Sequence, residues 1–287
     1  MKIQSLSVVV PGKACVNNCH CCVSKMSADD KQYKNQLEEN LAFYDLYLGD
    51  YIKRLEFCRD NGCNALMLTG NLEPQQNRRF LVDFGIMMRL MERPFRNIEL
   101  QTTGVLIDAP MLRFLRNHVG VNTIALSLFS FDDNENQACR NSNLPLGIKA
   151  FCEAVKLYDL NLRLCLNLTE HFNDWDIDCL FEYCKALGAD QITLRKLYAE
   201  GDSPQSKWVE GHGISPLRYR EIAEYVSKRP LLRRLEYGQL SYSIKGMSAV
   251  IDDDCMAKGP SDDFKYLVLR PNGKLYGSWD DPASLVF

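Results

Sequence analysis

Short apolar segments recur along the first two thirds of the chain. They are rich in valine, isoleucine and leucine, and several alternate with polar residues, which is typical of β-strands. The predicted strands cover residues 6–10, 65–69, 98–102, 123–127, 162–167 and 191–195.

The segments between these strands repeat apolar residues every three or four positions, the period of a helix with one buried face. The longest covers residues 29–60, and Asn61-Gly62 marks its expected end. Shorter helices are expected at residues 75–93, 110–117, 146–158 and 174–187. Strands that alternate with helices in this way favour parallel β/α units and an α/β fold.

The pattern changes after the sixth predicted strand. Residues 198–214 contain several glycines and are expected to form a loop, and Ser215-Pro216 is expected to begin a helix that ends near Lys228. Later residues favour β-structure, including a hairpin around Asn272-Gly273. The length of 287 residues suits one barrel with an extension. We therefore expect a barrel in residues 1–200, and a helix and β-hairpin extension in residues 201–287 that closes it.

The extension is rich in acidic and aromatic side chains. They are Asp252, Asp253, Asp254, Asp262, Asp263, Tyr266, Tyr276, Trp279, Asp280 and Asp281. Two interpretations remain open for this segment: it forms part of the site at the mouth of the barrel, or it is a solvated acidic surface whose hairpin covers an edge strand.

Composition and charge narrow the class of protein. A hydrophobic content of 46% supports a sizeable core, and the apolar runs are too short to span a bilayer. The net charge of −3 provides no general attraction for nucleic acid or for an anionic membrane. Twelve cysteines, and a start that reads as a strand rather than a signal peptide, favour a protein of the reducing cytoplasm.

Three cysteines lie close together after the first predicted strand, in the spacing Cys15-x3-Cys19-x2-Cys22. A [4Fe–4S] cluster has four irons, so three cysteine ligands leave one iron open to a molecule that is not protein. Structural zinc needs four ligands, usually as two pairs, and the sequence has no second pair at a suitable spacing. A disulfide framework fits poorly because the chain is not a small secreted scaffold. The spacing favours an iron–sulfur cluster, with zinc and incidental thiols as the alternatives.

This cysteine spacing resembles that of the radical S-adenosylmethionine (SAM) superfamily. The resemblance implies a partial (β/α)6 TIM-like barrel whose cluster loop, residues 11–27, binds one [4Fe–4S] cluster through Cys15, Cys19 and Cys22. In that family the open iron binds SAM, and the reduced cluster cleaves it to a 5′-deoxyadenosyl radical that abstracts hydrogen from a substrate. A strong reductant such as flavodoxin or ferredoxin is also implied. Cys21 occupies a position that is usually aromatic in the family.

The resemblance also implies SAM-binding residues at the ends of the strands. The run Thr69-Gly70-Asn71-Leu72-Glu73 resembles the family's Gly-Gly-Glu motif, so Gly70, Asn71 and Glu73 are expected near the methionine amino group. The alternative is an ordinary turn in which Glu73 caps a helix. Thr102-Thr103-Gly104, after the third strand, also lies at the expected mouth, where a capped turn is at least as good an interpretation.

Four further residues are expected to contact SAM. Ser127 and Arg140 lie in a segment similar to that of viperin-like members, in which an arginine meets the SAM carboxylate. Asn167 and Arg195 end the fifth and sixth strands and resemble family positions near the ribose and carboxylate. The alternatives are a helix-surface position for Arg140 and an outward-facing strand position for Arg195.

The expected function is that of a single-cluster radical SAM enzyme with an unidentified substrate. The viperin-like stretch favours a small molecule or nucleotide over a peptide, since no peptide-recognition domain is visible in the sequence. The alternative is a non-catalytic iron–sulfur or zinc-binding module that uses the barrel as a scaffold.

Overall fold

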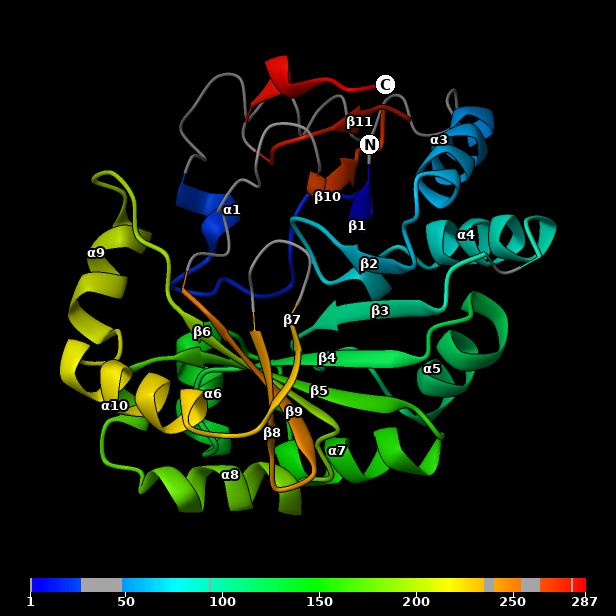
Figure 1. Cartoon of the computed structure of the whole chain (residues 1–287). Coiled ribbons are helices and arrows are strands. Elements are labelled where there is room, and N and C mark those ends of the chain that lie inside the picture. Colours follow the sequence, from blue (N-terminus) through cyan, green and yellow to red (C-terminus); the bar gives the residue numbers. More distant parts are fainter. Residues whose placement is uncertain (1, 27–47, 93, 235–239, 254–263, 280) are drawn as a thin grey trace.

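One mixed β-sheet organises the chain in the computed structural model, which describes residues 2–26, 48–92, 94–234, 240–253, 264–279 and 281–287 (Figure 1). Within these residues the strand order is β11-β10-β1-β2-β3-β4-β5-β6-β9-β8-β7. The strands are β1 (Ile3–Val9), β2 (Ala65–Thr69), β3 (Asn97–Thr102), β4 (Thr123–Leu128), β5 (Asn161–Leu168), β6 (Gln191–Lys196), β7 (Leu231–Arg234), β8 (Leu240–Ile244), β9 (Met247–Asp252), β10 (Phe264–Leu269) and β11 (Leu275–Tyr276). All six predicted strands are present, which confirms the α/β fold class.

Most of the helices cover the outer side of this sheet, while α1 (Val23–Met26) lies in the cluster loop at its mouth (Figure 1). The others are α3 (Leu48–Asp60), α4 (Arg78–Leu90), α5 (Ala109–Phe114), α6 (Asp133–Arg140), α7 (Ile148–Leu157), α8 (Ile177–Ala186), α9 (Pro204–His212) and α10 (Pro216–Ser227). A π-helical turn, Leu115–Val119, continues α5. Of the helix predicted over residues 29–60, the part before residue 48 lies outside the described residues. No helix among the described residues is both long enough and apolar enough to cross a membrane.

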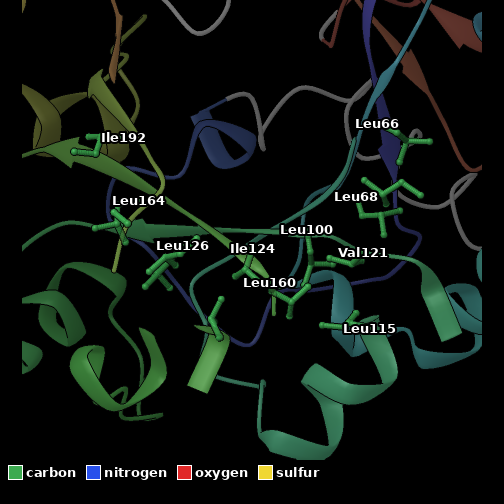
Figure 2. Close-up of a cluster of buried hydrophobic side chains, with 14 of the residues drawn as sticks. Leu66, Leu68, Leu100, Leu115, Val121, Ile124, Leu126, Leu160, Leu164 and Ile192 are labelled. Carbon is green, nitrogen blue, oxygen red and sulfur yellow. The ribbon is translucent and has the colours of Figure 1, made fainter. Parts of the chain in front are cut away.

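Alternation along the strands separates an apolar outer face from a polar inner face. Leu66, Leu100 and Ile124 are buried with the helices in one large core, part of which Figure 2 shows. Their neighbours Met67 and Glu99 point the other way and line an internal cavity. Successive side chains of a strand point to opposite faces, so this two-residue period alone places polar groups inside the curve of the sheet.

The extension joins both edges of the six-stranded sheet. β10 lies parallel to β1, with Ser5 opposite Tyr266, and β9 lies parallel to β6, with Thr193 opposite Val250. Eight neighbouring strands, from β10 to β9, are therefore parallel. Antiparallel β8 and β7 continue one edge and β11 the other, so the described strands form an open sheet. That the extension closes the mouth of the barrel stays a prediction.

Two helices differ from the sequence-based expectation. Residues 198–214 were expected to form a loop but contain α9, whose N-terminus is capped by Ser203 accepting a hydrogen bond from the Ser206 N–H. The glycines at both ends of this helix suggested a loop, whereas the Ser-Pro start is a capping signal. Helix α6 was not assigned from the sequence at all. Helix α10 begins as predicted, with Ser215 as its cap.

Candidate active site

The cluster loop follows β1 at the carboxyl ends of the parallel strands, which is where α/β barrels place their chemistry. Cys15, Cys19 and Cys22 all line the internal cavity. Burial, and after it the nearby Cys22 and Cys15 thiols, raise the pKa of the Cys19 thiol to about 12. These mutual interactions show that the structure brings the three predicted ligands together.

Cys21 has different surroundings from the three predicted ligands. Its side chain belongs to a small apolar cluster with Phe129, Cys139 and Val209, although it also borders the cavity. Burial raises the pKa of Cys21 as it does that of Cys19, but the Cys21 side chain is buried, whereas those of Cys15, Cys19 and Cys22 are partly exposed. This environment suits a packing role better than a ligand role.

The described residues contain no group of three or more His, Cys, Asp or Glu side chains arranged around a single metal ion. Cysteines bound to different irons of a cubane lie farther apart than ligands of one ion.

Glu73 is buried at the end of the loop after β2, and its carboxylate is surrounded by donors. Oε1 accepts hydrogen bonds from Asn17 Nδ2 (3.2 Å), the Thr103 N–H (3.0 Å) and Thr103 Oγ1 (2.7 Å). Oε2 accepts from Gln75 Nε2 (2.9 Å) and Thr102 Oγ1 (2.5 Å). This carboxylate thus joins the cluster loop, through Asn17, to the end of β3.

Buried acceptors next to this network have no partner among the described residues. Asn17 Oδ1 and Gln75 Oε1 make no hydrogen bond there. A buried polar atom without a partner costs free energy, and Asn17 lines the cavity, so its Oδ1 marks a place for a ligand donor. An ammonium group is a donor of this kind.

Helix α6 ends against the cluster loop. The N–H groups of Asn18 and His20 donate to the carbonyl oxygens of Arg140 (3.1 Å) and Cys139 (3.1 Å). The Arg140 side chain is fully buried, which excludes the helix-surface position. Its Nη1 donates to the Leu144 carbonyl oxygen (3.2 Å), and its buried Nε and Nη2 have no hydrogen-bond partner in the part of the chain that is described.

Burial is the main cause of the lowered pKa of Arg140. The negative charges of the nearby Cys19 and Glu73 groups act in the opposite direction and raise it. The Arg140 side chain does not itself line the cavity. The structure therefore places Arg140 behind the cluster loop, with unused donors.

The other predicted SAM-binding residues border the cavity. They are Gly70, Asn71, Ser127, Asn167 and Arg195. Gly70 has φ of +152°, and a Cβ there would lie 3.1 Å from the Val10 carbonyl oxygen, so this close approach of two loops requires glycine. Arg195 faces inward, where its Nε donates to Asp252 Oδ2 (3.0 Å).

The cavity has a volume of about 1120 Å³ and extends along the inner face of the sheet. Besides the predicted residues, its wall holds an ion pair between Arg163 and Glu99, with Nη1 2.8 Å from Oε2. Tyr266 and Trp279 of the extension also line it. The inner ion pair was not found by sequence reasoning, although its signal was present as charged residues at alternate positions of β3 and β5.

Helix α9 covers the cluster loop from outside. The ring of Trp208 stacks on His20 of the loop, with centroids 5.5 Å apart and an interplanar angle of 18°. His212, one helical turn later, stacks on the other side of the same indole at 4.9 Å. The segment expected to be a loop thus packs against the cluster loop, at His20 and at the apolar cluster that contains Cys21.

Comparisons with known proteins identify the fold. No protein-family model and no curated protein matches the chain. Among solved structures, anSMEcpe with bound AdoMet has a TM-score of 0.63 at 16% identity, over 99% of this chain and 74% of that chain. Its complex with AdoMet and the Kp18Cys peptide has a TM-score of 0.62 at 14% identity, over 98% and 76%. The radical SAM enzyme HemN from Escherichia coli also matches, with a TM-score of 0.47 at 15% identity, over 78% and 51%.

The likeness to anSMEcpe covers nearly the whole chain, including the strands of the extension. The chain has the partial-barrel fold of radical SAM enzymes.

Proposed function

We propose that the chain is a radical SAM enzyme that carries one [4Fe–4S] cluster and abstracts hydrogen from a polar small molecule or nucleotide. One observation carries this proposal: three cysteines of a single loop line a polar cavity at the carboxyl ends of the parallel strands. The likeness in fold to a structure with bound AdoMet supports it.

Cys15, Cys19 and Cys22 would hold the cluster, and SAM would lie among the residues that end the strands. When bound, the reduced cluster and SAM supply the 5′-deoxyadenosyl radical that abstracts hydrogen. Within this site Asn17 offers a buried acceptor for an ammonium group, and Arg195 offers a guanidinium for a carboxylate. Glu73 acts first as the anchor of the cluster loop.

Other residues of the chain keep water from the reaction. Trp208 and the apolar cluster around Cys21 cover the cluster loop, and the inner strands enclose the cavity. Exclusion of water prevents side reactions of a reactive intermediate. The reductant would be a protein of the flavodoxin or ferredoxin kind, and its contact with α9 would bring it close to the covered cysteines.

The test is anaerobic reconstitution with iron and sulfide, followed by SAM and dithionite. Formation of 5′-deoxyadenosine supports a radical SAM enzyme, whereas a stable cluster without SAM cleavage supports a non-catalytic module. Cys15→Ala, Cys19→Ala and Cys22→Ala should each abolish the cluster absorbance. Cys21→Ala should retain it, and so should the matched control Cys179→Ala on the exposed face of α8.

A further inference from the structure

An ion pair spans three strands inside the cavity. Arg163 of β5 reaches across β4 to Glu99 of β3, and its Nε also donates to Thr193 Oγ1 of β6 (2.9 Å). The residue of β4 that lies between them is Ala125, which is paired with Gln101 on one side and Arg163 on the other. Because alanine is small, the arginine side chain can cross the inner face of the sheet.

Filling the inside of a sheet with an ion pair is energetically unfavourable compared with apolar side chains. Barrels of parallel strands usually fill this space with branched apolar side chains. Taking two charges out of water costs several kcal/mol, and apolar residues of similar volume often stabilise a protein as well or better. Stability therefore does not explain why charged groups occupy these positions.

Glu99 and Arg163 differ in the hydrogen-bonding groups that remain available to the cavity. Glu99 is 1% exposed, and its oxygens accept from Arg163 and from Gln101 Nε2 (3.3 Å). The Arg163 side chain is 25% exposed and borders the cavity. Its Nη1 and Nε have partners, whereas its Nη2 has none within the described segments. The cavity therefore meets a charged donor that a buried carboxylate holds in one orientation.

We propose that Arg163 binds an anionic oxygen group of the substrate, either a carboxylate or a phosphate. This inference rests on the proposed function and names the chemistry of its substrate. The remaining Nη2 suits both groups because it is a charged donor that can form a charge-assisted hydrogen bond with an anionic oxygen of either. Glu99 and Thr193 act as positioning residues, since they fix the plane of the guanidinium without binding the substrate.

The depth of Arg163 sets the size of the substrate. Arg163 lies four residues before Asn167, and Asn167 is near the carboxyl end of β5. A rise of about 3.3 Å per residue therefore puts Arg163 about 13 Å below that end. A substrate anchored there can extend several bonds toward the strand ends where SAM is expected. Its reacting carbon is then remote from the anionic group.

The experiment uses the reconstituted full-length protein and two probe anions, inorganic phosphate and malonate. Thermal unfolding is followed during titration of each anion at constant ionic strength, with chloride as the balancing salt. The wild type should show a saturable rise in Tm with at least one probe, because a ligand that binds the folded state stabilises it. The probe that acts more strongly distinguishes a phosphate site from a carboxylate site.

Variants test whether Arg163 is the binding group. Arg163→Gln should weaken the apparent affinity at least tenfold, and Arg163→Lys should weaken it less because the charge remains. Arg113→Gln, on the exposed surface of α5, is the matched control and should bind as the wild type does. If Arg163→Gln leaves Glu99 unpaired and fails to fold, Glu99→Gln/Arg163→Gln removes both charges together.

Two results would overturn the proposal: no saturable effect of either anion on the wild type, or wild-type affinity in the folded double variant. SAM cleavage is measured on the same wild-type preparation. If the wild type cleaves SAM but binds neither anion, only the proposal that Arg163 binds the substrate is refuted. Anion binding without SAM cleavage refutes only the proposed function.

Discussion

Replacing Glu73 with glutamine separates two roles for this residue. Its resemblance to a SAM-binding motif predicts weaker SAM binding with the cluster intact. The structure instead places its carboxylate between the cluster loop and β3, where it accepts hydrogen bonds from Asn17, Gln75, Thr102 and Thr103. We therefore expect Glu73→Gln to loosen the cluster loop as well.

The size of the effect follows from the hydrogen bonds. An amide of the same shape keeps one acceptor oxygen but turns the other into a donor, which faces at least one donor of the network. Hydrogen bonds to charged groups contribute about 1.5–3 kcal/mol each. Losing one such bond and the charge assistance of the others should destabilise the protein by about 3 kcal/mol, which lowers Tm by about 5 °C in a chain of this length.

The assay measures Tm and the iron bound after reconstitution, with Glu153→Gln on the exposed face of α7 as the matched control. Both quantities should fall in Glu73→Gln and remain at wild-type levels in the control. Asn17→Ala combined with Glu73→Gln should be less damaging than the sum of the single changes, because both break the same contact. Wild-type Tm and iron content in Glu73→Gln, with weaker SAM binding alone, would refute the anchor role.

Three further changes test the packing around the site. Gly85→Ala should lower Tm because its Cβ would lie 2.3 Å from a backbone carbonyl oxygen of the π-helical turn. The Cβ of Gly49→Ala would meet no described atom within 4 Å, so this change should add up to about 1 kcal/mol of stability. A change in Tm of the same sign in both variants would contradict this reasoning. Trp208→Ala should speed the loss of cluster absorbance in air because the indole covers the cluster loop, and Trp175→Ala, which packs in the main core, should not. Deleting residues 238–287 should abolish the cooperative unfolding transition seen by circular dichroism, because it removes β9 and β10 from both edges of the sheet; a folded product would show these strands to be dispensable.

Local patterns were sufficient for the six central strands and the position of the cluster loop. The two-residue period of a strand and the three-to-four-residue period of a helix depend on neighbouring residues alone. The order of strand and cysteine loop can therefore be read directly from residues 6–22, whereas the short helix α1 within the loop was not predicted. The hairpin around Asn272-Gly273 was predictable for the same reason, and it is present as β10 and β11.

Contacts between distant residues account for what the sequence did not show. The glycines around α9 suggested a loop. The structure has a helix there, and its Trp208 stacks on His20 of the distant cluster loop. The pairing of Arg163 with Glu99 depends on the register of three strands and on a small residue between them. Charged residues in these strands are visible in the sequence, but their partners are not.

The sequence by itself determined the α/β class, the order of the central elements and the three cysteines that define the chemistry. Tertiary structure decided where the extension pairs, because an unpaired edge of the sheet offers the same backbone donors and acceptors to any strand. It added β9 next to β6 and β10 next to β1. It also placed the Glu73 carboxylate between the cluster loop and the end of β3, a position that the sequence motif does not specify. The role of a carboxylate depends on which donors the fold brings to it.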